Sequence, residues 1–375
     1  MHMTAGLPPR LAALHAFIVK SALPLWATAG VDPAGAFHEH LHLDGSPHTA
    51  TVRRMRGQAR QIYVYAHAHL LGLFDGAALA TRAFGRMVAD FWQPGGGFIL
   101  SVGPDGSPRD TSRTAYDQAF GLLSMAWLFR LTGSAVYLDW AARTLGFMDA
   151  ALADRAHGGY ADHVRAASRC QNPHMHLLEA LLALFEATGD EQFLDRADAV
   201  HALFATRFLD RSVPALREFF DAAWTPDPVR GDHLDPGHHL EWVWLLDRYR
   251  HHRPAAVDET AALLGFARRG IDPRDGLVVD EVWADGRTLR ATKRMWPQTE
   301  HLKAQVVIFE RNPARGLHDI DRVCGQLMEH YLDPATGTWN DQVGADGERL
   351  SKVSPVSSFY HLFLAYSEAM RVAGG

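Results

Sequence analysis

Cysteine is scarce in this chain. Its two cysteines, Cys170 and Cys324, lie in different segments and without CxxC spacing. This pattern excludes a disulfide framework and a thiolate metal site. It is typical of a reducing compartment, so we expect a cytoplasmic protein.

An excess of basic residues is also lacking. The 375 residues include 37 Lys and Arg against 43 Asp and Glu, a net charge of -6, and no segment gathers the basic residues into a stripe. Nucleic acids and anionic membranes attract basic surfaces. We therefore expect neither partner.

The chain has no long uninterrupted apolar run. Its most apolar stretch, residues 11–30, is broken by a histidine, a lysine and a proline. Apolar residues recur there at helical spacing, at Leu11, Leu14, Phe17 and Ile18. The pattern predicts an amphipathic first helix rather than a cleaved signal or a membrane span.

Alternation of strands and helices is missing as well, which argues against a parallel sheet. Apolar spacing predicts twelve helices instead. They cover residues 8–27, 50–72, 76–92, 114–132, 134–152, 172–188, 190–208, 238–251, 254–270, 296–311, 315–332 and 357–372.

Similar eleven-residue loops recur between these helices. Residues 96–106 (GGFILSVGPDG), 276–286 (GLVVDEVWADG) and 337–347 (GTWNDQVGADG) begin with Gly and end in Asp-Gly, and 158–164 is a shortened relative. Asp-Gly favours the corner of a β-hairpin. The spacing of these loops indicates about six units of roughly sixty residues, with one hairpin lost.

Six helix pairs must stack on one another to bury their apolar faces. The ends of the chain show no obvious polar capping repeat, so we expect the stack to close. The sequence thus predicts an all-α protein, a single (α/α)6 barrel over residues 1–375 with short β-hairpin loops at the pocket mouth.

Polar residues follow the same period. Five of them, near the starts of alternate helices, are separated by 60, 62, 62 and 61 residues, and an arginine lies 56 residues before the first. A single buried histidine would be a satisfied core residue, but five residues in register indicate a pocket. The set is Arg60, Tyr116, His176, His238, Glu300 and His361.

Four other histidines lie off this register: His67, His69, His174 and His239. We expect them to be core residues with hydrogen-bond partners.

The predicted pocket suits proton transfer. Two facing histidines can act as base and acid near neutral pH. Glu241 follows His238 by three residues and shares its helix face. Arg60 can hold hydroxyls or a developing oxyanion, and Trp296 offers a flat face to a sugar ring. Together these residues predict proton abstraction beside a carbonyl of a polyhydroxylated substrate.

Six motifs carry a family resemblance: RQIYVY, YDQAF, NPHMHLLEA, PGHHLEW, WPQTEHLKA and FYHLF, in this order over residues 60–363. With them the chain resembles the N-acylglucosamine 2-epimerase superfamily, which includes mannose isomerases, sulfoquinovose isomerases and cellobiose 2-epimerases. The resemblance implies an (α/α)6 barrel in which the sugar ring opens, a histidine removes the C2 proton and a cis-enediolate forms. It implies no metal and no other cofactor.

The resemblance also implies roles for individual residues. His238 and His361 match the acid/base pair, and His176 and Glu241 match residues that assist ring opening and hold the base. The remaining positions are expected to contact the sugar: Arg60, Tyr116, Asn172, Trp296 and Glu300.

Two positions depart from the pattern of mannose- and sulfoquinovose-type members. Pro228 stands where an arginine is common, with Arg230 nearby, and Ser357 replaces a frequent glutamine. Both departures concern substrate specificity rather than the chemistry.

We expect a metal-free isomerase that interconverts D-mannose and D-fructose, acting on a small monosaccharide as a monomer or homodimer. A 2-epimerase of mannose/glucose or of an N-acylated hexosamine is the alternative. Remoter alternatives are a helical-barrel glycoside hydrolase using Glu241 and Glu300, a metal enzyme with His176, His238 and His361 as ligands, and a sugar-binding barrel without catalysis.

Overall fold

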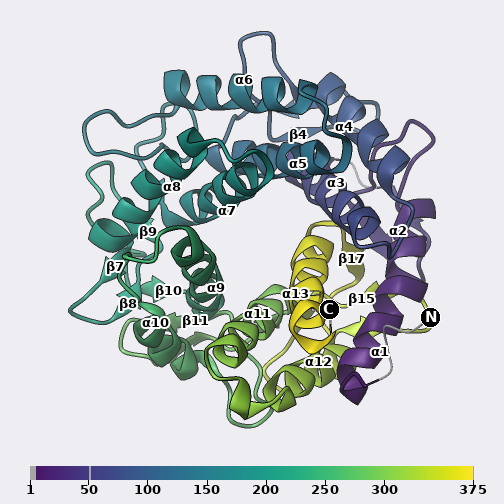
Figure 1. Ribbon diagram of the computed structural model, residues 1–375, viewed down its shortest axis with the longest axis vertical. Helices are drawn as coiled ribbons and strands as arrows, with labels where there is room; N and C mark the ends of the chain where they lie inside the picture. The colour runs from purple at the N-terminus through teal and green to yellow at the C-terminus, as the bar shows by residue number, and fades with distance from the viewer. Residues whose placement is uncertain (1–5, 50–51, 375) are drawn as a thin grey trace.

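A computed structural model describes residues 6–49 and 52–374, and its helices form two concentric rings (Figure 1). The inner ring consists of α3 (Met55–Leu70), α5 (Ala115–Thr132), α7 (Gln171–Thr188), α9 (Pro236–His252), α11 (Met295–Arg311) and α13 (Ser357–Gly374). Each inner helix packs on the next, and α13 packs on α3. The predicted closed (α/α)6 barrel is therefore confirmed.

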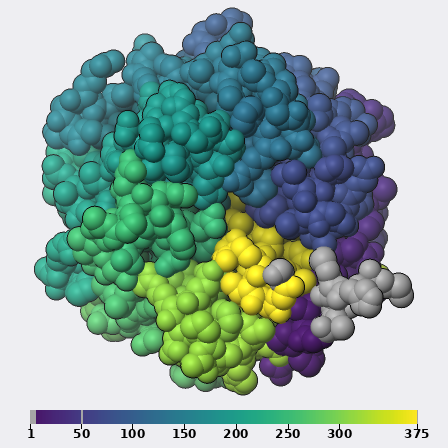
Figure 2. Space-filling model, viewed as in Figure 1, coloured from purple at the N-terminus to yellow at the C-terminus, as the bar shows by residue number. Residues whose placement is uncertain are grey.

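The outer ring covers the inner one. It consists of α1 (Pro9–Phe17), α2 (Leu23–Thr28), α4 (Ala77–Phe91), α6 (Val136–Ala151), α8 (Glu191–Leu203), α10 (Thr260–Ala267) and α12 (His318–His330). The first helix packs on the last two, α12 and α13, so the two ends of the chain meet. Figure 2 shows the yellow C-terminal residues beside the purple N-terminal ones.

Local sequence explains where the helices begin and end. The hydroxyl of Thr114 caps α5 by accepting the N–H of Asp117 at 3.0 Å. Gly133 and Gly189, in the predicted stops LTGS and ATGD, end α5 and α7 with φ of 69° and 72°. Only glycine adopts this left-handed conformation without strain.

Two of the predicted helices contain a π-helical turn, and two others are shorter than predicted. The first helix contains a π-helical turn, Ile18–Ala22, before Pro24, which has no N–H for the regular ladder. A similar turn, Phe204–Phe208, extends α8. The predicted helix 254–270 is shortened to α10 and a 3-10 turn, Arg268–Gly270. The predicted helix 50–72 begins at Met55, and residues 50–51 lie outside the described residues.

Among the described residues, one segment, Pro9–Thr28, is long and apolar enough to cross a membrane by length and composition. In the barrel this segment forms α1, the π turn and α2. Its apolar side chains, among them Leu14, Phe17 and Trp26, are buried in the main core. It is therefore part of the barrel wall.

Short antiparallel strands connect the helices. They are β1 (His40–His42), β2 (Pro47–His48), β3 (Arg53–Arg54), β4 (Ser101–Val102), β5 (Pro108–Asp110), β6 (Arg169–Cys170), β7 (Leu209–Asp210), β8 (Ala215–Leu216), β9 (Phe219–Phe220), β10 (His233–Leu234), β11 (Glu281–Trp283), β12 (Thr288–Arg290), β13 (Lys293–Arg294), β14 (Leu332–Asp333), β15 (Thr338–Trp339), β16 (Gln342–Val343) and β17 (Val353–Pro355). Each sheet has two or three strands.

Two of the predicted hairpins are present as strand pairs, and three hairpins, β1–β2, β7–β8 and β14–β15, were missed. The strands of loop 337–347 pair with β14 and β13 instead, and only an isolated bridge, Val343 to Arg349, forms at its Asp-Gly corner. Pairs β4–β5 and β11–β12 form the hairpins expected from residues 96–106 and 276–286. Residues 35–45 (GAFHEHLHLDG) form β1–β2, with Leu41 where the recognised copies have valine. Residues 209–216 form β7–β8 where a hairpin seemed lost, because this loop lacks the Gly and Asp-Gly corners.

A repeated backbone hydrogen bond ties each loop to a neighbouring unit. The N–H at the start of an inner helix donates to a carbonyl in the following unit's loop, and the last bond returns to the first loop. The bonds are Met55–Leu100 (3.0 Å), Ala115–Asp162 (3.0 Å), Gln171–Glu218 (3.1 Å), Met295–Asp341 (2.8 Å) and Val356–Glu39 (2.9 Å). At α9, Pro236 has no N–H to donate, and β10 pairs with β11 there.

The seam between the chain ends predicts a stability effect. Trp26 of α2 stacks on Trp339 of β15 with ring centroids 5.3 Å apart, and both side chains are fully buried. Trp26→Ala should lower the free energy of unfolding by about 3–5 kcal/mol in urea titrations. Trp26→Phe should cost less than about 1.5 kcal/mol because it retains most of the buried volume. Equal losses for the two variants would contradict this account of the seam.

Candidate active site

One cavity of about 240 Å³ opens at the end of the barrel where the inner helices begin. Eight of the nine predicted site residues line it: Arg60, Tyr116, Asn172, His176, His238, Glu241, Trp296 and His361. The ninth, Glu300, lies behind His361 and is bonded to it. Five further residues line it: Asp235, Arg294, Asp341 and Ser358, which the sequence did not identify, and Ser357, which it marked only as a departure from the family pattern.

The site residues occupy two levels, not the single height that their spacing indicated. The upper level holds second and third residues of inner helices: Tyr116, Asn172, His238 and Trp296. The lower level holds fifth and sixth residues: Arg60, His176, Glu241, Glu300 and His361. Three to four residues correspond to about 5–6 Å along a helix. The sixth residue of α5, Phe120, completes the lower level.

His238 faces a carboxylate that the sequence did not identify. Its Nδ1–H donates to Oε2 of Glu218 at 2.9 Å. Burial lowers the pKa of His238, but the negative charges of Glu218 and Asp235 outweigh burial and raise this pKa to about 9. His238 is therefore an imidazolium at neutral pH.

A sequence signal for Glu218 exists in the loops. One position recurs every 56–62 residues, and it is acidic in five of its six copies: Glu39, Asp162, Glu218, Asp280 and Asp341. The second copy is Leu100. The carboxyl groups of most of these residues accept hydrogen bonds from residues at the start of a neighbouring inner helix. Asp280, for example, accepts the backbone N–H of Arg294, the residue before α11, at 2.8 Å. Tracing acidic residues at the barrel period would have found Glu218.

His361 differs from His238 in being neutral. Its Nδ1–H donates to Oε1 of Glu300 at 2.9 Å, which leaves Nε2 without this proton. Burial, together with the positive charges of Arg60 and Lys303, lowers the pKa of His361 well below its ordinary value. His361 is therefore a neutral base at neutral pH.

His176 lies at the floor of the cavity. Its Nδ1–H donates to Oε2 of Glu179 at 3.1 Å. Burial lowers the pKa of His176 to about 4 although Glu179 opposes the shift. The hydroxyl of Tyr360 also donates to Glu179, so this carboxylate is held between His176 and Tyr360.

Arg60 and Asn172 present polar groups to the cavity. The guanidinium of Arg60 donates to the carbonyl of Ser357 at 3.1 Å and to the hydroxyl of Tyr116 at 2.8 Å, and lies 4.1 Å above the ring of Phe120. The side-chain oxygen of Asn172 is buried without a hydrogen-bond partner. An unpaired polar atom at a cavity wall is available to a ligand.

The off-register histidines have structural partners, as expected. His174 donates to the carbonyl of Cys170 and accepts the N–H of Tyr160, and His239 bonds Asp235 and Leu216 in the same way. His67 bonds the hydroxyl of Tyr63. His69 differs from the expectation, because it is half-exposed and pairs with Asp75.

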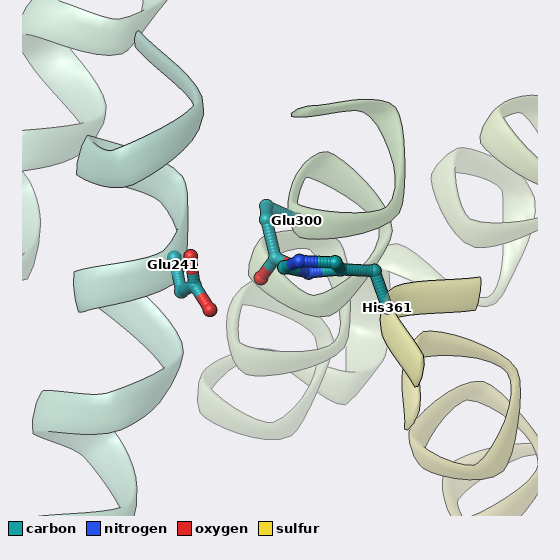
Figure 3. A group of neighbouring side chains, drawn as sticks. All are labelled: Glu241, Glu300 and His361. Atoms are coloured by element: carbon teal, nitrogen blue, oxygen red, sulfur yellow. The ribbon is translucent and has the colours of Figure 1, made fainter. Parts of the chain in front are cut away.

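A possible metal-ligating group differs from the one that the sequence suggested. Instead of three histidines, Glu241, Glu300 and His361 converge, with ligand atoms within 4.8 Å of one another (Figure 3). The ammonium of Lys303 lies 2.6 Å from Oε2 of Glu300 and 4.0 Å from Oε1 of Glu241. These carboxylates therefore already share a positive charge.

The chain matches a known family over most of its length. The family model for N-acylglucosamine 2-epimerase matches residues 35–365. A mannose-6-phosphate isomerase of Rhizobium meliloti (strain 1021) is 33% identical, over 98% of this chain and 97% of the relative. A D-mannose isomerase of Thermobifida fusca is 26% identical, over 76% and 75%.

Solved structures agree on the fold. A crystal structure of D-mannose isomerase superposes with a TM-score of 0.87 at 21% identity, covering 96% of this chain and 97% of that one. The cellobiose 2-epimerase from Bacillus thermoamylovorans B4167 gives the same TM-score at 20% identity, covering 96% and 99%. The chain belongs to the N-acylglucosamine 2-epimerase family and is an enzyme of the isomerase class.

Proposed function

We propose that this protein interconverts an aldose and its ketose, D-mannose and D-fructose, through a cis-enediolate. The observation that carries the proposal is a pair of histidines that line one cavity and differ in protonation: His361 is neutral and His238 is protonated. Environments that push two pKa values apart assign a base and an acid.

The proposed reaction begins with ring opening, assisted by His176 and Glu241 at the cavity floor. Nε2 of His361 then takes the proton from C2 of the open sugar, while the His238 imidazolium donates a hydrogen bond to the carbonyl oxygen. The resulting enediolate is stabilised by this positive charge and by Arg60. The O2 hydroxyl proton passes to O1, and return of the proton from His361 to C1 then gives the ketose with its carbonyl at C2.

The charges of the cavity favour an uncharged sugar over a sugar phosphate. Arg294 is engaged by Asp235 at 3.1 Å and by Asp280 at 3.0 Å. The carboxyl groups of Asp235 and Asp341 also line the cavity. A phosphate would therefore meet acidic groups and a guanidinium that is already paired. The name of the 33% identical relative nevertheless makes mannose 6-phosphate a substrate to test.

A 2-epimerase of mannose/glucose or of an N-acylated hexosamine is the second candidate. His238 and His361 come from different helices and both lie beside Trp296, with ring centroids 4.9 Å and 5.6 Å from it. If the protonated His238 delivers its proton to C2 from the opposite face, the product is the epimer. Hydrolysis is less favoured, since Glu300 is engaged by Lys303 and His361 and is not free as a second carboxylate.

The remaining attributes belong to the same proposal. We infer a cytoplasmic enzyme that uses no metal and acts as a monomer or homodimer, without nucleic-acid or membrane partners. The net charge of -6 and the low cysteine content support the absence of a nucleic-acid partner and the location.

The reaction itself can be followed by proton NMR with mannose in D2O, with and without EDTA. We expect fructose to form with deuterium from solvent at the exchanged carbon, at the same rate in EDTA. His361→Ala should lower the rate about 10²–10⁴-fold, the contribution of a general base. Glucose as the product would establish the epimerase instead. No turnover of mannose, mannose 6-phosphate, N-acetylmannosamine or cellobiose would refute the proposal.

The pKa of His238 predicts a pH effect. If the imidazolium is required, kcat/KM should fall as pH rises through about 9. Glu218→Gln removes the negative charge that stabilises the imidazolium, so the basic limb should move to lower pH by about 1–3 units. Glu348→Gln, at an exposed loop position, is the matched control and should not move it. An unchanged basic limb in Glu218→Gln would show that this proton is not required.

A further inference from the structure

A buried cluster of charges lies beneath the candidate base. Glu179, Glu241 and Glu300 contribute three carboxyl groups, and Lys303 contributes one ammonium. Glu300 and Lys303 are completely buried, and Glu241 is 1% exposed. Buried charges must be paired to be tolerated, so the position of the single lysine decides which carboxyl groups can ionise.

Lys303 is placed between two carboxyl groups. It lies one turn after Glu300 on α11, with Nζ 2.6 Å from Oε2 of Glu300 and 4.0 Å from Oε1 of Glu241 on α9. Nζ also lies 4.4 Å from the ring of Trp244, a favourable position for a cation. Glu300 thus holds the lysine through one oxygen and His361 through the other.

The same carboxyl groups could bind a metal. Figure 3 shows Glu241 pointing from its helix toward Glu300 and His361, and their ligand atoms lie within 4.8 Å of one another. Two carboxylates and an imidazole are a common ligand set for divalent cations. A metal at this point would have to compete with the ammonium of Lys303 for Glu300.

We propose that Lys303 is the resident cation of this cluster: its ammonium takes the place that a divalent metal would otherwise fill and keeps Glu300 ionised as the anchor of His361. Lys303 is a positioning residue that acts through Glu300 and keeps its own proton throughout. The exclusion of metal follows from the geometry alone. The effect on turnover rests on the proposed function.

Charge balance connects the lysine to the base. An ionised Glu300 can only accept, so it holds the Nδ1–H of His361 and leaves the Nε2 lone pair for the C2 proton. When Nε2 gains that proton, the Glu300 carboxylate stabilises the imidazolium. A protonated Glu300 would no longer be restricted to accepting this bond, and the tautomer of His361 would not be fixed.

The first test is Mn²⁺ binding, followed by the electron paramagnetic resonance signal of free Mn²⁺. The wild-type protein should leave millimolar Mn²⁺ free. Lys303→Met should bind one Mn²⁺ per chain about tenfold more tightly or better, and further substitution of Glu300→Gln should abolish this binding. Lys293→Met is the matched control, because Lys293 is equally buried but pairs with Asp272 at 2.9 Å and with Asp275, so any Mn²⁺ that this variant binds should be retained when Glu300→Gln is added.

The second test is the pH profile of turnover. Removal of the positive charge raises the pKa of Glu300, so the acid limb of kcat/KM in Lys303→Met should move to higher pH by about one unit or more. Lys293→Met should leave the limb in place. Lys303→Gln repeats both tests if the methionine variant does not fold.

Two results would overturn the proposal. One is stoichiometric Mn²⁺ binding by the wild-type protein that is lost in Glu300→Gln. The other is a foldable Lys303 variant with neither a gain in Mn²⁺ affinity nor a shifted acid limb. If the wild-type protein isomerises no sugar, the proposed function fails, but the Mn²⁺ result still decides the role of Lys303.

Discussion

Closure of the barrel is the constraint on which the site depends. The N–H of Val356 donates to the carbonyl of Glu39, β17 pairs with β1, and α13 packs on α3. These contacts join residues from opposite ends of the sequence, such as Glu39 and Val356. They bring His361, near the C-terminus, into the cavity that Arg60 lines near the N-terminus. An open stack of the same helix pairs would leave these two side chains at opposite ends of the molecule.

The closed lumen then sets the electrostatics. Water is replaced by side chains, so each ionisable group is controlled by its few neighbours. Glu218 and Asp235 make His238 an acid, while burial and the charges of Arg60 and Lys303 keep His361 neutral. The two histidines have the same intrinsic chemistry and each bonds a carboxylate, but negative charges outweigh burial at His238, whereas burial and neighbouring cations prevail at His361.

The sequence predicted much of the fold and most of the candidate site. Helical periodicity located twelve helices. The period of polar residues led to six site residues, and their helix neighbours and the family resemblance added Asn172, Glu241 and Trp296; the barrel brings all nine together. The prediction that all the site residues lie at one height was wrong. Tyr116 and His238 lie about one helical turn closer to the start of their helices than the other residues of the periodic set. Periodicity along a chain measures position only to about one turn of a helix.

Residues in loops were the hardest to predict. Glu218 lies in a loop without the Asp-Gly signature, and its contact with His238 depends on how that loop folds over α9. Lys303 looks like an ordinary helix residue, and its role depends on the approach of Glu241 from a neighbouring helix. These contacts join side chains from different repeats of the barrel. They depend on how closely a loop or helix approaches its neighbour, and the residue pattern within a single repeat does not encode that distance.

The central claim is that one protonated and one neutral histidine face the same cavity. Nitrogen-15 NMR of the histidine side chains tests it most directly. In the substrate-free protein at neutral pH, we predict that both ring nitrogens of His238 carry protons. His361 should carry one proton, on Nδ1. Assignment follows from the loss of each signal in His238→Gln and His361→Gln. Two neutral rings, or two imidazolium rings, would contradict the account.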